Sequence, residues 1–314
     1  MSATPALSVV VPAYNEAESL PELQRELAAA LDQFGRPWEV IYVDDGSRDG
    51  SDAAIERLAA ADPRVSGVSL RRNFGKSAAL ATGFRLARGA WVMTIDADLQ
   101  DDPAELPKLA AALESGLDLV SGWKQHRRDP VTKTLPSVLF NRVTSWVSGV
   151  RLHDFNCGFK LYRREVTESI EVYGEFHRFT PALAHWAGFR VGEVPVNHRA
   201  RKFGHSKFGA SRFINGFLDL LSAAFISTSA LKPLHVFGRI GLLFLLGGMG
   251  IGVWFVVLWA QGEPIRVRPL MLFGAGLVLL GIQFILMGLL GEMIANMRAR
   301  ADYPLRRTYG TRDA

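Results

Sequence analysis

The sequence predicts an α/β protein with a mainly parallel, Rossmann-like sheet, followed by a C-terminal hairpin of two transmembrane helices. Over the first two-thirds of the chain, short apolar runs of strand length alternate with stretches of helical length. This alternation is typical of a parallel sheet flanked by helices. Near the C-terminus, residues 240–262 and 269–291 carry no charged side chain, and each stretch exceeds the roughly 20 residues that cross a bilayer as a helix.

Three of the five expected strands end in polar residues that could bind a ligand. We expect strands at residues 7–14, 38–45, 64–70, 91–98 and 118–123, and helices at 18–34, 51–60, 77–88 and 103–115. In such sheets ligands bind at the carboxyl ends of the strands. The polar residues at these ends are Tyr14 and Asn15 after the first strand, Asp44 and Asp45 after the second, and Asp96 and Asp98 after the fourth.

Composition narrows the classes of function. The chain has 314 residues, a formal net charge of +5 and one cysteine, Cys157. A single cysteine excludes an internal disulfide and fits a reducing compartment. The positive charge is mild, and without a basic run or zinc spacing we expect no nucleic-acid partner. Anionic lipid is the better partner for it.

The chain divides into four expected parts. Residues 1–208 form the catalytic domain, 209–233 an amphipathic helix in the membrane interface, 234–292 the two spans (about 236–260 and 269–291), and 293–314 a basic tail. An ordinary domain helix remains the alternative for 209–233, and two buried helices of a soluble core the alternative for the spans. The basic residues before the first span and in the tail outnumber those of the connecting loop. This bias predicts an inner-membrane protein with the catalytic domain and both termini in the cytoplasm.

The stretch TIDADLQDDP crowds four aspartates behind an apolar strand. Asp96 and Asp98 are two apart on an extended segment and therefore point the same way. Carboxylate oxygens are ligands for hard cations, and Mg²⁺ often binds one or two carboxylates plus substrate phosphates. We expect Mg²⁺ or Mn²⁺ at Asp98, with Gln100 and Asp96 contributing. Asp101 and Asp102 precede Pro103 and are expected to cap a helix.

No glycine-rich phosphate loop follows the first strand, since neither GxGxxG nor a P-loop is present. A bound nucleotide must therefore be held by side chains and a metal. In VDDGSRDGS we expect Asp44 or Asp45 to contact a ligand, whereas Asp49 and Ser51 fit a helix cap.

The motifs PAYNE, VDDGS, RRNFGKSAAL and DADLQDDP, in this order and spacing, resemble glycosyltransferase family 2, which has the GT-A fold. The segments SGWKQHRRDP, DFNCGFKLYRR and HRARKFGHSKFG, with the two spans, resemble more narrowly the polyprenyl-phosphate glycosyltransferases. These include undecaprenyl-phosphate glucosyltransferases and dolichyl-phosphate mannose synthases. The QxxRW motif of processive synthases is absent, so transfer of a single sugar is expected.

The resemblance implies roles for individual residues. The aspartate of HDFNCGF, Asp154, would be catalytic, together with Asp98. Asp96, Asp98 and Gln100 would serve the metal and the diphosphate. The nucleotide-sugar contacts would be Pro12, Tyr14, Glu16, Asp44, Asp45, Lys76 and Asp96.

Basic residues after the fifth strand and before the first span are candidates for binding the acceptor phosphate. Arginine suits bidentate phosphate contacts, although a positive surface that attracts lipid headgroups explains the same residues. Arg142 lies on an apolar helix and is the first candidate. Arg199 is among the basic residues before the first span to which both interpretations apply. The set retained for the acceptor phosphate is Lys124, Arg128, Arg142, Arg201 and Lys207.

The expected reaction is inverting transfer of one hexose from a nucleotide diphosphate sugar, UDP-glucose first, to a polyprenyl phosphate. The alternatives are a GDP-mannose-dependent mannose synthase and a non-catalytic, membrane-anchored sugar-nucleotide-binding protein. The acceptor phosphate is largely anionic at neutral pH, so Asp154 is expected to orient a group more than to remove a proton. Glycine-rich spans allow a homo-oligomer, and two helices leave transport of the product to a separate flippase.

Overall fold

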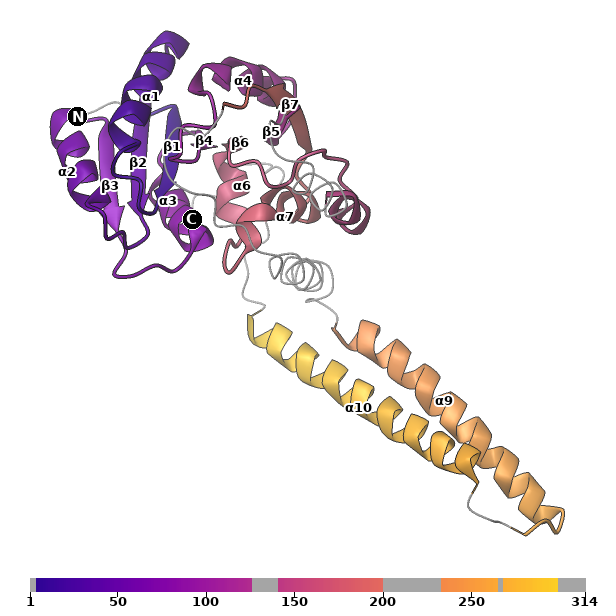
Figure 1. Ribbon diagram of the computed structural model, residues 1–314. Helices are drawn as coiled ribbons and strands as arrows, with labels where there is room; N and C mark the ends of the chain where they lie inside the picture. The colour runs from indigo at the N-terminus through magenta and orange to yellow at the C-terminus, as the bar shows by residue number, and fades with distance from the viewer. Residues whose placement is uncertain (1–3, 126–140, 200–232, 265–267, 299–314) are drawn as a thin grey trace, which may run out of the picture. The chain divides into compact units, whose positions relative to one another are not determined.

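The computed structural model describes residues 4–125, 141–199, 233–264 and 268–298 of the chain (Figure 1). It divides into two compact units, residues 1–223 and 224–314, which are described separately below. The predicted interfacial helix at 209–233 lies outside the described residues except for Pro233, and the basic tail lies outside them from residue 299 onward.

The first unit is built on a seven-stranded sheet with the order β3-β2-β1-β4-β6-β5-β7. All neighbours run parallel except β6, which is antiparallel to both β4 and β5. The mainly parallel sheet of the prediction is therefore confirmed. The strands are β1 (Leu7–Ala13), β2 (Trp38–Asp44), β3 (Val65–Ser69), β4 (Trp91–Thr94), β5 (Leu119–Lys124), β6 (Lys160–Arg163) and β7 (Val191–Val196).

Helices cover both faces of this sheet, because the strands alternate buried apolar side chains between the two faces. One cluster joins Val9 and Val11 to α1 (Leu20–Phe34), α2 (Ser51–Ala61) and α4 (Leu106–Glu114). The other joins Val10 to α3 (Lys76–Leu86), α6 (Arg164–Ser169) and α7 (Thr180–Trp186). Short 3₁₀ turns at Pro103–Glu105 (η1) and Phe176–Arg178 (η2) precede α4 and α7. Residues 141–148 are also helical.

The four expected helices and five expected strands of the first part are present. The strand expected at 91–98 is shorter, because β4 ends at Thr94 and the chain then turns, so the expectation that Asp96 and Asp98 share one extended segment is wrong. The sequence did not indicate α6, α7, β6 or β7. Of these, β6 enters the sheet between β4 and β5 against their direction. It has only four residues, KLYR, with a buried lysine at its start. Such a run carries no alternation by which a strand is recognised.

The second unit is a pair of long helices, α9 (Pro233–Ala260) and α10 (Pro269–Arg298), both long and apolar enough to cross a membrane. The predicted spans lie within them. Glycines seven residues apart let the two backbones approach: a methyl group at Gly241 would lie 2.7 Å from the carbonyl oxygen of Gly281, and one at Gly248 would lie 2.6 Å from that of Gly274. Small residues at such contacts are a common device for packing membrane helices.

Candidate active site

The predicted site residues in the first unit converge on one edge of the sheet. The parallel strands β1, β2, β4, β5 and β7 end there, and the antiparallel β6 begins there. The ladder between β1 and β4 stops at Val10 and Thr94. Pro12, whose nitrogen carries no hydrogen, lies just beyond that point on β1. The strand order reverses between β1 and β4, which is where open α/β sheets bind their ligands.

Asp96 is held in place from two sides. Its Oδ1 lies 2.5 Å from Nζ of Lys76, the first residue of α3. On the other side, a methyl group added at Gly158 would lie 2.5 Å from Cγ and both oxygens of the Asp96 carboxyl. Burial alone would raise the pKa of Asp96, but Lys76 outweighs it and lowers the pKa to about 2. Asp96 is therefore a fixed anion with its charge already balanced.

The next residues form a tight turn. Leu99 is almost fully buried and has φ of 60°, a left-handed conformation that a residue other than glycine seldom adopts. The amide of Gln100 donates to Oδ1 of Asp98 at 3.2 Å. This turn places Asp98 and Gln100 together behind β4.

The crowding of four aspartates is explained by separate partners. Asp101 is buried and its Oδ1 lies 2.7 Å from Nζ of Lys124. Burial would lower the pKa of Lys124, but the carboxylates of Asp101 and Asp96 raise it above its usual value. Asp102 accepts from the amide of Ala104 at 3.0 Å as the predicted cap, and its Oδ1 also lies 2.8 Å from Nη2 of Arg199. Three of the four carboxylates thus have a cation each.

Of the two aspartates at the end of β2, Asp45 anchors a loop. Both its oxygens accept backbone hydrogen bonds, from Phe74 at 2.7 Å and Gly75 at 2.8 Å, and these fix the start of α3. Asp44 is also buried and accepts from the amide of Ser47 at 3.1 Å. The expected ligand contact at Asp44 or Asp45 stays a prediction, but the anchoring of Lys76 through Asp45 was not foreseen.

The loop after β1 is joined to the loop after β2. Asn15, with φ of 57°, donates its amide to Oγ of Ser47 at 2.8 Å. Oε2 of Glu16 accepts from the hydroxyl of Ser19 at 2.9 Å. Tyr14 is exposed at this edge and Pro12 is half-buried. The nucleotide contacts predicted here therefore lie close together at the end of β1, and their role stays a prediction.

Asp154 lies in the turn that leads into β6. Its side chain is buried and its Oδ1 accepts from the amide of Asn156 at 3.1 Å. The helix at 141–148 supports this turn, because Nδ2 of Asn141 donates to the carbonyl of His153 at 2.7 Å. The predicted catalytic residue is thus built into the same edge as Asp96, through Gly158 four residues later.

Two residues that sequence reasoning missed face the same region. Lys160 is 3% exposed and its ammonium donates to the carbonyl of Cys157. Burial lowers the pKa of Lys160 to about 8. Nδ1 of His177 lies 3.0 Å from the Ser77 hydroxyl, and burial, with Lys76 nearby, lowers the pKa of His177 to about 2. The only available signal was a lysine inside an otherwise apolar run.

The predicted acceptor-phosphate residues differ in their surroundings. Lys124 is occupied by Asp101, as described above. Arg142 is exposed on the helix at 141–148, beside the residue that supports the Asp154 turn. Arg128, Arg201 and Lys207 lie outside the described residues.

The donor set fits a metal shared with a substrate. In the described part of the chain, no group of three or more His, Cys, Asp or Glu side chains is arranged to hold a metal ion by itself. The turn does bring one carboxylate, Asp98, beside the side chain of Gln100. Oxygen donors of this number match the pattern in which phosphate oxygens complete the coordination of Mg²⁺ or Mn²⁺.

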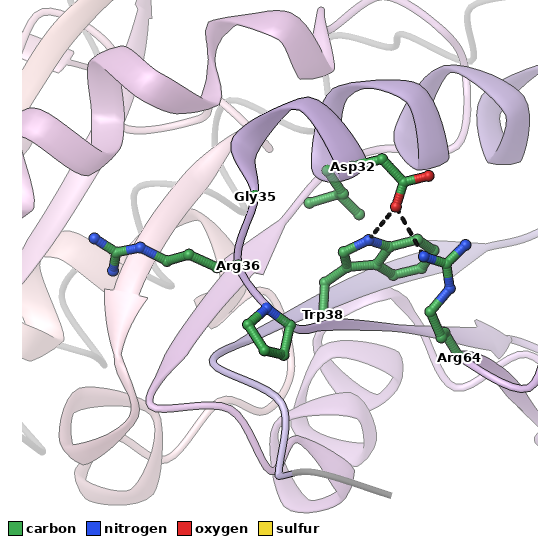
Figure 2. A pocket seen from close by; sticks show the side chains of 7 residues that line it. Asp32, Gly35, Arg36, Trp38 and Arg64 are labelled. Carbon is green, nitrogen blue, oxygen red and sulfur yellow. Dashed lines mark hydrogen bonds and ion pairs between the residues drawn. The ribbon is translucent and has the colours of Figure 1, made fainter.

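A hollow elsewhere on the first unit lies at the amino end of β2 (Figure 2). Three of its polar groups bind one another: Oδ1 of Asp32 accepts from Nε1 of Trp38 at 2.9 Å and from Nη1 of Arg64 at 2.8 Å. The guanidinium of Arg64 also lies 3.8 Å from the ring centroid of Trp38. This hollow is at the edge of the sheet opposite the aspartates, and we assign it a structural role.

Comparisons with known proteins define the class to which this fold and site belong. Residues 8–171 match the family described as glycosyl transferase family 2, and residues 232–297 match the family described as the GtrB C-terminal hairpin. Solved structures similar in fold include glucosyl-3-phosphoglycerate synthase from Mycobacterium tuberculosis with Mn²⁺, UDP-glucose and phosphoglyceric acid, at a TM-score of 0.55 and 21% identity over 73% of this chain and 82% of that one. A mannosyltransferase from Pyrobaculum calidifontis with GDP-Man and Mn²⁺ has a TM-score of 0.51 and 20% identity, over 95% of this chain and 76% of that one.

The chain belongs to glycosyltransferase family 2, with the GT-A fold, and is a glycosyltransferase. Its curated relatives cover nearly its whole length. A dodecaprenyl-phosphate galacturonate synthase from Rhizobium johnstonii is 38% identical over 94% of this chain and 89% of its own. An undecaprenyl-phosphate 4-deoxy-4-formamido-L-arabinose transferase from Salmonella enteritidis is 36% identical over 95% of this chain and 91% of its own. The predicted resemblance to polyprenyl-phosphate glycosyltransferases is confirmed.

Proposed function

We propose that the protein transfers one sugar residue from a nucleotide diphosphate sugar to a polyprenyl phosphate. The observation that carries this proposal is the joining of a family 2 domain to an apolar hairpin in one chain, as in full-length relatives named for polyprenyl-phosphate substrates. Those relatives are named for galacturonate and a formamido-arabinose, and neither name supports glucose. UDP-glucose therefore enters the test as one donor among several, with GDP-mannose beside it.

The donor's diphosphate is assigned to the turn behind β4. Asp98 and Gln100 would hold a divalent cation, Mg²⁺ or Mn²⁺, which when bound supplies electrostatic stabilisation of the departing nucleotide diphosphate. Lys76 sits at the amino end of α3 and adds positive charge there, while Asp96 holds its ammonium in place. The nucleotide contacts remain those expected on the loops after β1 and β2.

The acceptor phosphate attacks the anomeric carbon in line with the departing group. An acceptor oxygen forms the new bond, the nucleotide diphosphate leaves with the electron pair, and the configuration inverts. The second pKa of a phosphate monoester is about 6, so the attacking oxygen is already anionic. Asp154, buried and bonded within its own turn, then serves to orient a basic side chain or the sugar.

The hairpin fits this acceptor. A polyprenyl tail stays in hydrocarbon while its phosphate stays at the surface, and an anchored enzyme searches for it laterally at a raised effective concentration. We propose that the catalytic domain and both termini lie on the cytoplasmic side, from the charge bias described above. A homo-oligomer and a separate flippase remain part of this proposal.

The test is incubation of the purified full-length protein with undecaprenyl phosphate, Mg²⁺ or Mn²⁺, and a panel of UDP- and GDP-sugars, including UDP-glucose, a UDP-uronic acid and GDP-mannose. Mass spectrometry of the lipid is expected to show the addition of one sugar from one donor. Binding of a nucleotide without any lipid product across the panel would favour the non-catalytic sugar-nucleotide-binding protein instead.

A further inference from the structure

The turn that carries Asp98 and Gln100 is bound by the segment that follows β7. Residues 197–199, called the strap below, lie along the aspartate loop: His198 forms a β-bridge with Asp101, and the amide of Arg199 donates to the carbonyl of Gln100 at 2.9 Å. Next to them, Nδ2 of Asn197 donates to Oε1 of Glu105 at 2.8 Å. The strap thus contacts the aspartate loop at two successive positions, His198 and Arg199, and the following turn η1 through Asn197.

The guanidinium of Arg199 fastens the strap to two elements. Nη1 lies 2.6 Å from Oε2 of Glu26 on α1, and Nη2 lies 2.8 Å from Oδ1 of Asp102. The carboxylates of Glu26 and Asp102 are 19% and 17% exposed, and Arg199 is 37% exposed. The sequence suggested lipid phosphate or headgroups as partners for this arginine, but both arms of its guanidinium are engaged within the protein.

The turn between Asp98 and Gln100 needs such support. Leu99 is held at φ of 60°, and strained backbone of this kind persists only where its surroundings determine it. The backbone of Gln100 is held on both sides, because its amide donates to Asp98 and its carbonyl accepts from the amide of Arg199 in the strap. Without the ion pairs of Arg199, the strap would no longer hold the turn, and the turn could relax.

We propose that Arg199 is a positioning residue for the metal and diphosphate site. It acts through the strap on the geometry of Asp98 and Gln100 and touches neither substrate. This inference rests on the proposed function, because it takes the turn to be the place where the donor's diphosphate is bound. Groups that orient metal ligands from outside typically change metal affinity or activity 10–100-fold when removed.

The experiment compares Arg199→Gln with Arg190→Gln in the full-length protein. Arg190 precedes β7 at its amino end and pairs its Nε with Oδ2 of Asp118 at 3.1 Å, so it supplies a matched ion pair at the opposite edge of the sheet. Calorimetry would measure binding of UDP, and of GDP in a parallel arm, over a Mn²⁺ titration. Hydrogen exchange would report on residues 96–102. Arg199→Gln is expected to weaken Mn²⁺-dependent nucleotide binding about tenfold or more and to speed exchange in the loop, with Arg190→Gln unchanged.

A rise in donor KM larger than the fall in kcat at saturating Mn²⁺ is also expected for Arg199→Gln. Unchanged binding and exchange in a folded Arg199→Gln protein would overturn the inference, as would an equal loss in Arg190→Gln. Should Arg199→Gln not fold, Glu26→Gln decides, since it removes one anchor and keeps the other; it must weaken binding in the same direction. Failure of the wild type to glycosylate lipid would instead count against the proposed function, which these binding measurements do not involve.

Discussion

Gly158→Ala tests whether activity depends on the position of the Asp96 carboxylate. The added methyl carbon would lie 2.5 Å from Cγ and both oxygens of that carboxyl, whereas carbon atoms in ordinary contact are about 3.5–4.0 Å apart. The carboxylate must therefore move by about 1 Å, and its 2.5 Å contact with Lys76 must lengthen. A misplacement of about 1 Å in a catalytic site costs about 10²-fold in rate, so kcat/KM for the donor should fall by about that factor.

The cost in stability should be much smaller. Overpacking by one methyl group typically costs about 1–3 kcal/mol, and the loss of a glycine from the unfolded chain returns about 0.4–1 kcal/mol. A thermal melt alongside the transfer assay separates the two effects. Gly192→Ala is the matched control: its methyl group would also lie 2.5 Å from a neighbour, but that neighbour is Cδ1 of Leu117, the end of a flexible side chain on the far side of the sheet from the site.

Wild-type kcat/KM in a folded Gly158→Ala protein would refute the reasoning, because it would mean that the Asp96 carboxylate can move without consequence. A loss of activity in Gly192→Ala of the same size would equally remove the link to the site. Neither result depends on which sugar the enzyme transfers, provided that one donor has been identified.

Four further predictions follow from the same geometry. Asp98→Ala should lower lipid glycosylation by at least about 100-fold, and EDTA should abolish it in the wild type; activity that survives both would exclude the assigned metal site. Asp154→Asn should lower the rate by a factor that does not change with pH, whereas a defect of about 10²–10⁴-fold relieved at high pH would identify a base. Burial lowers the pKa of His177 to about 2, whereas the unfolded pKa is about 6.5, so folding with a neutral His177 becomes less favourable as pH falls below about 6.5. Melting temperatures between pH 7 and 5 should therefore fall more steeply in the wild type than in His177→Gln, which keeps an acceptor for Ser77. Parallel melting curves would contradict this. Gly281→Leu places a side chain where even a methyl carbon would lie 2.7 Å from the facing backbone of α9. The melting temperature in detergent should therefore fall. Gly276→Leu is the control, because a side chain there meets open space.

Much of the fold could be predicted because its signals are local. Each expected strand and helix in the first part is present, with only β4 ending well before its expected last residue, and the hairpin follows from two uncharged stretches. The aspartates after β4 were recognised as site candidates from their place at a strand end, but the turn that carries them was expected to be extended. The antiparallel β6 was not predicted, since its four residues acquire their burial only from β4 and β5 on either side.

The supporting contacts of the site could not be predicted for a similar reason. Arg199 meets Glu26 across 173 positions of the chain, and Lys124 meets Asp101 across the sheet edge. Sequence spacing carries no information about such pairs, so both cations were interpreted from their charge alone as candidates for a phosphate or a lipid surface. Gly158 illustrates the same limit, because its need to be glycine is visible only once Asp96 lies against it.

The pairing of three of the four aspartates with separate cations restricts how this enzyme can change over evolution. Replacing Asp101 alone would leave the Lys124 side chain, which is 12% exposed, without its counter-ion. Removing one partner of a buried ion pair costs about 3–5 kcal/mol. Neutral drift at these positions must therefore proceed through paired substitutions. Across related chains, Asp101 and Lys124 should covary, and so should Asp102 and Arg199. The turn that carries Asp98 and Gln100 should stay constant.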